Sequence, residues 1–464
     1  MVAVPADDAG LEALLLELYT HERKLVALHP DATRRTLDAL GRPDARVPAA
    51  QIAGTNGKGS VSCMVAAGAA AAGRRVGLFT SPHLVDWRER VQFWGPGPGA
   101  EWIGRAEALG AIRAALGAAE VPLTFFEVTT VAALWEMARA GVDLAVLEVG
   151  LGGRLDSTSA VAATVGAVVT IGRDHMEVLG ETEEAIAREK AGIAKPGMKV
   201  VSGVGGPTGA VVSAEVAARG GRVAQLGVEF RYETRPRGGA IAYEGPRWRL
   251  DEVRVAMAGA HQRHNAAVAL RVLEELAAAL PALGLDARRA EVAAAAGAAR
   301  WPGRFEVLAR EGADGPDGDA AAALDAGGAV VVLDAAHNPD GAAALARTLG
   351  EELAAARPRR VHLVLGAMGD KDARGLLAPL LPLVDEATFV RAPGARAQDP
   401  AALCRVAAAL RPDLLARSAG DTEPARVALD VLRAAADDDL VLVAGSIYLL
   451  GAVRPALRTA LGLG

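Results

Sequence analysis

The chain has 464 residues, of which 51% are hydrophobic, 4% aromatic and 23% charged, and its formal net charge is −6 at pH 7. This length predicts two or three domains with an ample apolar core, and the charge does not indicate a protein that binds nucleic acid through a basic surface. Cys63 and Cys404 lie far apart without metal-site spacing, which fits a reducing compartment. Asp7, Asp8 and Glu12 disfavour a signal peptide, and no apolar run reaches membrane-span length, so we expect a cytoplasmic protein.

Short apolar runs alternate with helical patterns along most of the chain. The candidate strands are Arg46–Ala53, Arg75–Phe79, Leu144–Val149, Ala163–Ile171, Lys199–Val204, Val330–Leu333, Val361–Leu365, Glu386–Val390 and Leu440–Val443. This alternation predicts an α/β fold with mostly parallel sheets that are covered on both faces. The rhythm breaks at Trp301-Pro302-Gly303. We therefore expect one domain over residues 1–302 and a smaller one over residues 303–464.

Other segments depart from this alternation. Helices are expected over Leu11–Tyr19, Val61–Ala72, Asn265–Ala279 and Ala287–Ala299. The stretch Phe230–Val255 alternates apolar and polar residues in two places, which predicts a small antiparallel patch. The stretch Glu311–Gly328 is rich in Gly, Asp and Ala and is typical of a flexible loop or a hairpin tip.

Residues 53–60 read Ala-Gly-Thr-Asn-Gly-Lys-Gly-Ser and follow a short apolar run. The glycines permit a tight turn that aims backbone N–H groups inward, and the following apolar helix would direct a positive dipole at an anion. The common phosphate loop closes Gly-Lys-Ser/Thr, whereas here Gly59 separates Lys58 from Ser60. A plain glycine-rich turn is the alternative reading. The expected phosphate-binding residues are Gly54, Thr55, Asn56, Gly57, Lys58, Gly59 and Ser60.

Polar side chains follow the neighbouring candidate strands. Ser81 comes after the second strand, Glu148 ends the third, and His175 follows the fourth. Ligands of open α/β sheets bind beyond the carboxyl ends of the strands, so these groups should gather beside the phosphate loop. Glu148, expected to be a partly exposed acid, stands where a phosphate-loop protein places a carboxylate for Mg²⁺. A turn serine, a surface glutamate and a structural histidine are the alternatives.

Lysine occurs only at positions 24, 58, 190, 195, 199 and 371, although Lys and Arg together number 50. Arginine serves most positive charges in this chain, so a retained lysine hints that an amine is needed. Lys190, in a helical stretch, is either such a residue or an ordinary ion-pairing lysine. Further polar clusters end three strands of the second domain, at 334–341, 366–372 and 444–448, and each is either part of a ligand site or a helix cap.

Together these motifs resemble folylpolyglutamate synthase/dihydrofolate synthase, a branch of the Mur ligase superfamily. The resemblance covers nearly the whole chain and implies a P-loop ATPase domain followed by a smaller Rossmann-like domain that binds glutamate. The matching segments are Gly54–Ser60, Thr80–Leu84, Phe125–Glu127, Glu148–Thr158, Asp174-His175, Glu189–Ile193, His261-Gln262 with Asn265-Ala266, Trp301–Phe305, Asp334–Gly341, Gly366–Asp372 and Gly445–Tyr448.

The resemblance also implies roles for single residues. Lys58 would hold the β- and γ-phosphates of ATP, and Asn265, Arg304 and Asp334 would contact the nucleotide. Lys190 would be carbamylated by CO₂, which turns a cation into a carboxylate near a second Mg²⁺. The implied Mg²⁺ ligands are Ser81, Glu148 and His175.

The substrate residues are implied in the same way. His337 and Ser446 would face the incoming L-glutamate, and His337 joins Lys58 and Lys190 as a catalytic candidate. The implied residues of the pterin-binding region are Phe125, Phe126, Glu127, Leu155, Asp156 and Ser157. Asp31–Arg34 is a further candidate for this region, although residues 29–33 depart from the family's usual pattern.

The resemblance implies an ATP-dependent ligase that adds L-glutamate to dihydropteroate, to reduced folates such as tetrahydrofolate, or to both, through an acyl phosphate. A Mur-type ligase that acts on a UDP-muramyl precursor is the alternative enzyme. A P-loop switch or nucleic-acid motor is the alternative from another class, but it predicts a basic groove and tandem motor motifs that the sequence lacks. We expect a monomer with small-molecule substrates and neither nucleic acid nor membrane as a partner.

Overall fold

The computed structural model describes residues 8–22, 30–97, 99–235, 239–309, 329–356 and 358–463. The chain forms two compact units. Unit 1 comprises Met1–Val255 with Arg263–Ala299, and unit 2 comprises Ala256–Gln262 with Arg300–Gly464. The short segment 256–262, which the sequence analysis assigns to the first domain, is thus grouped with the second. The loop predicted over Glu311–Gly328 lies outside the described residues.

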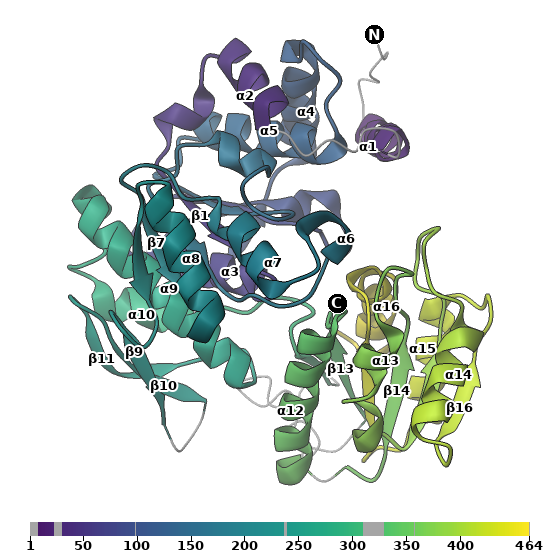
Figure 1. Cartoon of the computed structure of the whole chain (residues 1–464). Helices are drawn as coiled ribbons and strands as arrows, with labels where there is room; N and C mark the ends of the chain where they lie inside the picture. Colours follow the sequence, from purple (N-terminus) through teal and green to yellow (C-terminus); the bar gives the residue numbers. More distant parts are fainter. Residues whose placement is uncertain are drawn as a thin grey trace. The chain divides into compact units, whose positions relative to one another are not determined.

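Unit 1 is built on a sheet of eight strands in the order β4-β3-β2-β5-β1-β6-β7-β8. Figure 1 labels two of these strands, β1 and β7. The strands are β1 (Ala49–Ala53), β2 (Val76–Phe79), β3 (Val91–Trp94), β4 (Ala100–Trp102), β5 (Leu144–Glu148), β6 (Val165–Val168), β7 (Lys199–Ser202) and β8 (Arg222–Gln225). All neighbouring pairs from β2 to β8 are parallel, whereas β3 and β4 pair antiparallel. The five predicted strands of this domain are confirmed, each shorter than expected.

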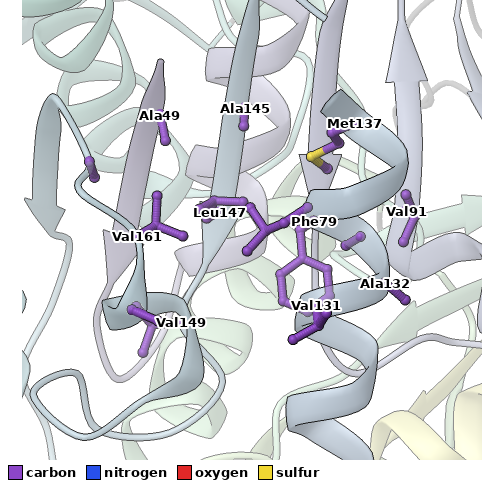
Figure 2. Packing of buried hydrophobic residues seen from close by; sticks show 14 of the residues in the cluster. Ala49, Phe79, Val91, Val131, Ala132, Met137, Ala145, Leu147, Val149 and Val161 are labelled. Carbon is purple, nitrogen blue, oxygen red and sulfur yellow. The ribbon is translucent and has the colours of Figure 1, made fainter. Parts of the chain in front are cut away.

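The sheet of unit 1 is covered by helices on both faces, as the sequence predicts. Phe79 and Leu147 pack with Val131 and Met137 of α5 (Figure 2). Ile52 is fully buried as well and points to the other face by alternation, where α3 contacts β1, β2 and β5. The described helices of this unit are α1 (Asp8–Glu22), α2 (Pro30–Ala39), α3 (Lys58–Ala71), α4 (Arg105–Ala118), α5 (Phe125–Arg139), α6 (Met176–Leu179), α7 (Glu183–Ala191), α8 (Gly206–Ala218), α9 (Ala260–Ala279) and α10 (Arg289–Ala298).

The predicted antiparallel patch is a three-stranded sheet of β9 (Arg231–Thr234), β10 (Ala240–Glu244) and β11 (Arg249–Arg254), in the order β11-β10-β9. Glu274 of α9 anchors it. The Tyr243 hydroxyl donates to one carboxylate oxygen of Glu274 at 2.6 Å, and the Trp248 N–H donates to the other at 2.8 Å. Arg271 pairs with the same buried carboxylate at 2.7 Å, so the charge of Glu274 is both hydrogen-bonded and neutralised.

Unit 2 contains a six-stranded sheet in the order β12-β13-β17-β14-β15-β16. Its strands are β12 (Glu306–Leu308), β13 (Val330–Asp334), β14 (Val361–Leu365), β15 (Glu386–Phe389), β16 (Leu415–Ser418) and β17 (Leu440–Ala444). Only β12 runs antiparallel to its neighbour. The described helices are α12 (Pro339–Ala356), α13 (Ala373–Leu377), α14 (Pro400–Leu410), α15 (Pro424–Ala434) and α16 (Ile447–Ala460). This arrangement confirms the predicted smaller α/β domain with a mostly parallel sheet.

Five strands were not predicted: β3, β4, β8, β12 and β16. They are short, and most lie at or near a sheet edge, where side chains are partly exposed and no continuous apolar run is needed. Among the helices that the structure describes, none is long and apolar enough to cross a membrane.

The packing of α10 on β11 yields a stability prediction. A Cβ atom at Gly297 would overlap the backbone carbonyl oxygen of Arg254, whereas one at Gly110 in α4 would meet open space. We expect Gly297→Ala to lower the free energy of unfolding by about 1–3 kcal/mol, because the backbone must move apart. Gly110→Ala, the matched control in a helix interior, should raise it by about 0.5–1 kcal/mol. Urea unfolding of both variants tests this, and equal stabilities would contradict the packing.

Candidate active site

The phosphate loop joins β1 to α3 and is held by the end of β6. The N–H groups of Thr55 and Asn56 donate to the carbonyl and hydroxyl oxygens of Thr170, each at 2.9 Å. Gly57 precedes α3 with φ 84°, and a Cβ atom there would lie 2.6 Å from Oδ1 of Asn265. Only glycine fits this left-handed position against a buried amide. The structure therefore brings Asn265, a predicted nucleotide contact, to the loop.

Ser60 tests whether the loop fits a phosphate or a metal ion. Its hydroxyl lies in the first turn of α3, is buried, and has no hydrogen-bond partner among the described residues. An unpaired buried hydroxyl is costly unless a ligand completes it. The Ser60 hydroxyl, one residue later than in the common phosphate loop, is thus open to a ligand, and the residues of the loop fit an anionic phosphate with its cation.

Two lysine amines meet at one carbonyl of this loop. Lys58 Nζ donates to the Gly54 oxygen at 3.1 Å and to the Thr55 oxygen at 3.2 Å, and Lys190 Nζ donates to the same Gly54 oxygen at 3.0 Å. Lys190 is 5% exposed and forms no ion pair among the described residues, so the ion-pairing alternative for it is not observed. Burial and, next, the charge of Lys58 lower the pKa of Lys190 to about 7.

The predicted metal ligands are partly brought together. The Ser81 N–H donates to Oε2 of Glu148 at 3.1 Å, so the ends of β2 and β5 meet. Glu148 is only 5% exposed, so the expectation of a partly exposed acid was wrong: flanking parallel strands enclose it. His175 lies at the start of α6, in a left-handed conformation with φ 52°, and 41% of its side chain is exposed. The hydrogen bond from Ser81 thus groups that residue with Glu148.

The two aromatic residues at the start of α5, Phe125 and Phe126, differ in how far their rings are exposed. Phe125 is only 3% exposed: Tyr19 stacks on its ring at 4.0 Å between centroids, and the Arg90 guanidinium lies 5.0 Å from its centroid. Glu127 forms a capping box with Thr124. Phe126 is half-buried beside Gly150, where a Cβ atom would lie 2.5 Å from its ring. Phe126 is therefore the more available of the two rings.

Asp156 organises the loop that follows β5. Its carboxylate accepts from the N–H groups of Gly150 and Leu151, each at 3.0 Å, and from the hydroxyl of Thr158 at 2.6 Å. Burial raises the pKa of this carboxyl. Gln51 of β1 donates to the same Thr158 hydroxyl at 2.9 Å, which links the loop to the strand that carries the phosphate site. Ser157 is buried next to Asp156, and Leu155 is half-buried.

In unit 2, the predicted residues lie at the carboxyl ends of β13 and β17. Asp334 is buried and accepts from the N–H groups of Phe305 and Ala336, each at 2.8 Å, and burial raises its pKa. His337 Nδ1 lies 2.9 Å from the Ala335 oxygen. Ser446 caps α16 and Asp372 caps α13, so the helix-capping alternative is observed in these two clusters.

Two residues around the phosphate loop were missed by the sequence analysis. Thr170 contacts the backbone of the loop through both its hydroxyl and its carbonyl, and Gln51 supports the neighbouring loop. Thr170 lies two residues past the end of β6 and inside the predicted strand Ala163–Ile171, so a polar residue near the carboxyl end of that strand was the available signal. Gln51 lies inside a fully buried strand, where an amide among apolar residues indicates a buried polar network.

The buried amine of Lys190 predicts a pH-dependent stability. Its pKa is about 7 in the folded protein and 10.5 ordinarily, so the unfolded chain binds the proton more tightly. The buried Lys190 ammonium therefore lowers the free energy of unfolding. This loss is complete below pH 7 and disappears as the pH rises towards 10.5. Lys190→Met should therefore unfold at higher urea concentration than the wild type at neutral pH in CO₂-free buffer, and the difference should shrink towards pH 10.

The half-exposed Lys199, paired with Glu275 at 3.4 Å, offers a control. Lys199→Met should show no such pH-dependent gain. If Lys190→Met were no more stable than the wild type at neutral pH, this would contradict the burial of the Lys190 amine and its lowered pKa.

Comparison with known proteins places this geometry in a family. The sequence profile of the Mur ligase middle domain matches residues 52–273, and that of the Mur ligase glutamate ligase domain matches residues 320–447. The chain is 34% identical to the dihydrofolate synthase/folylpolyglutamate synthase of Mycobacterium tuberculosis, over 97% of this chain and 95% of that protein. It spans only 48% of the probable bifunctional folylpolyglutamate synthase/dihydropteroate synthase of Haloferax volcanii, to which it is 37% identical over 91% of this chain.

Solved structures agree with this placement. The structure of E. coli FolC in complex with DHPP and ADP superposes with a TM-score of 0.83 at 28% identity, covering 98% of this chain and 100% of that one. The bifunctional folylpolyglutamate synthase/dihydrofolate synthase of Yersinia pestis, complexed with AMPPNP and Mn ion, gives 0.80 at 29% identity, covering 98% and 100%. These relatives favour the folate branch over the muramyl alternative. The chain belongs to the folylpolyglutamate synthase/dihydrofolate synthase family of Mur ligases.

Proposed function

We propose that the chain is an ATP-dependent ligase that joins L-glutamate to dihydropteroate, to reduced folates, or to both. The observation that carries the proposal is the phosphate loop in which Lys58 and the buried Lys190 share the Gly54 carbonyl. Its relatives support the substrates: one structure holds DHPP and ADP, and another holds Mn, AMPPNP and L-glutamate.

The reaction joins a carboxylate, which is a poor acyl donor, to an amine. The γ-phosphoryl group of ATP moves to a carboxylate oxygen of the pteroate or folate, which gives an acyl phosphate and ADP. The amino group of L-glutamate then attacks the carbonyl carbon, phosphate leaves with the transferred oxygen, and the amine loses a proton as the amide forms. Catalysis requires two anions to be aligned and neutralised, and Lys58 beside the loop N–H groups supplies positive charge for this.

Ser81 and Glu148 would hold a divalent cation, with His175 as the third predicted ligand. Mg²⁺ prefers oxygen ligands, and the hydrogen bond from the Ser81 backbone N–H to Glu148 brings the residue that carries the hydroxyl to this carboxylate. When bound, the cation would neutralise charge on the transferred phosphoryl group. Asn265, Arg304 and Asp334 would position the nucleotide.

The remaining predicted residues would bind the substrates. Phe126, with the loop that Asp156 organises, would face the pterin side of the folate, since its ring is more available than that of Phe125. His337 and Ser446 would take the glutamate. A monomeric, cytoplasmic enzyme is part of the same proposal.

A product assay tests the proposed function. Dihydropteroate and tetrahydrofolate are incubated separately with labelled L-glutamate, ATP and Mg²⁺. We expect glutamate-containing product and equimolar ADP with one or both acceptors. Glu148→Gln, which keeps a hydrogen-bond acceptor for the Ser81 N–H, is the folded, inactive control. ATP turnover independent of both acceptors would contradict the proposal.

Lys190 is proposed to carry a carbamate in the active enzyme. A neutral amine attacks the carbon of CO₂ and loses a proton, which leaves a carboxylate on the side chain. Burial disfavours the ammonium form, so the amine is available for this step. The carbamate would supply oxygens near the predicted cation site.

The carbamate predicts how variants of Lys190 behave. Lys190→Ala should lose at least about 100-fold in turnover, because the aligning oxygens are absent, and small carboxylic acids should restore part of it. Lys190→Arg should fail too, since arginine keeps the charge but cannot form a carbamate. Turnover in ¹³CO₂-equilibrated buffer, with ¹³C NMR of the carbamate, measures this. An Arg variant with wild-type turnover would make Lys190 an ordinary cation.

A further inference from the structure

A bidentate ion pair in unit 2 holds the backbone beside Arg304. Arg454 of α16 contacts Glu306 of β12 through Nε, at 3.0 Å to both carboxylate oxygens, and through Nη2 at 2.6 Å. Glu306 Oε2 also accepts from the Gly303 N–H at 2.9 Å. The two side chains are only 21% and 16% exposed. One carboxylate therefore ties the edge strand to a helix and fixes the residue that precedes Arg304.

A second carboxylate fixes the residue after Arg304. Phe305 has φ 46°, a left-handed conformation that a bulky residue adopts only under restraint. The restraint is the hydrogen bond from its N–H to Asp334 at 2.8 Å, and the Phe305 side chain is buried in the core. The Gly303 carbonyl accepts from the Ala335 N–H at 2.9 Å. The backbone on both sides of Arg304 is thus held at several points.

Arg304 itself forms no bidentate ion pair of this kind among the described residues, although its charge interacts with the Asp334 carboxyl. Its guanidinium is half-buried and donates to the Gly303 carbonyl at 3.2 Å. The direction in which it reaches therefore depends on the backbone of 303–305 and on the charge of Asp334. A rigid backbone that presents a half-exposed arginine is the arrangement that pre-organises an anion contact.

We propose that Glu306 and Arg454 are positioning residues that orient Arg304, the predicted nucleotide contact of unit 2. The inference rests on the proposed function and deepens it, because it assigns the affinity for ATP partly to an ion pair that does not touch ATP. This positioning requires the bidentate contact of the Arg454 guanidinium with Glu306. A lysine at position 454 would keep the charge but lose the paired N–H groups.

The chain offers a matched control for a purely structural role. His362 and Asp439 form a pair at 3.0 Å, 14% and 5% exposed, at the amino end of β14 and β17 in the same sheet. Arg304 and Asp334 lie at the opposite, carboxyl end of these strands. Loss of the His362 pair should disturb the stability of unit 2 without moving Arg304.

Calorimetric binding of AMPPNP to the full chain, with KM for ATP in the product assay, tests the inference. Glu306→Ala should weaken AMPPNP binding roughly tenfold, since a misplaced contact loses its energy, while KM for L-glutamate and kcat change little. Glu306→Gln and Arg454→Lys are milder substitutions that are less disruptive to folding. Their affinity for AMPPNP should lie between those of the wild type and Glu306→Ala. His362→Ala should lower the melting temperature and leave AMPPNP affinity unchanged.

A double-variant cycle shows whether Glu306 acts through Arg304. Arg304→Ala alone should weaken AMPPNP binding, and Glu306→Ala added to it should cause little further loss. Additive losses, or wild-type affinity in the folded Glu306 and Arg454 variants, would overturn the inference while the proposed function stands. Equal losses in His362→Ala would overturn it too. A wild-type protein that neither binds AMPPNP nor forms product would overturn both.

Discussion

The Gly54 carbonyl accepts hydrogen bonds from two lysine amines, Lys58 and Lys190, and the chemistry of unit 1 depends on this convergence. Burial is the larger cause that lowers the pKa of Lys190, and repulsion by the charge of Lys58 is the second. In the proposed function, Lys58 is the charge that faces the phosphates, and Lys190 is the amine that reacts with CO₂. The loop would then give two lysines two different roles.

Buried carboxylates shape the loops around the predicted ligand residues in both units. Asp156 gathers the N–H groups of the loop after β5, and Asp334 with Glu306 holds the backbone around Arg304. Each carboxylate accepts several hydrogen bonds, which offsets the cost of burying its charge. Several residues expected to touch ligands therefore also build the loops, and their substitution would affect affinity and stability together.

Much of the fold could be predicted because its central strands are short apolar runs that end in polar or glycine-rich segments. The phosphate loop was recognisable because it follows such an apolar run and because its glycines permit the tight turn that the loop requires. The edge strands were missed because partly exposed strands such as β16 carry no apolar run. The burial of Glu148 and of Phe125 depends on contacts with distant segments, which no local pattern contains. The roles assigned to single site residues remain predictions.

Transfer of oxygen from the acyl substrate to phosphate tests the central claim most directly. Dihydropteroate or folate labelled with ¹⁸O in the reacting carboxylate is turned over with ATP and L-glutamate, and the released phosphate is analysed by mass spectrometry. The account predicts that each phosphate carries one ¹⁸O atom, because the carboxylate oxygen leaves with the phosphoryl group. Unlabelled phosphate formed together with the amide product would contradict an acyl phosphate, and with it the mechanism derived from the phosphate loop.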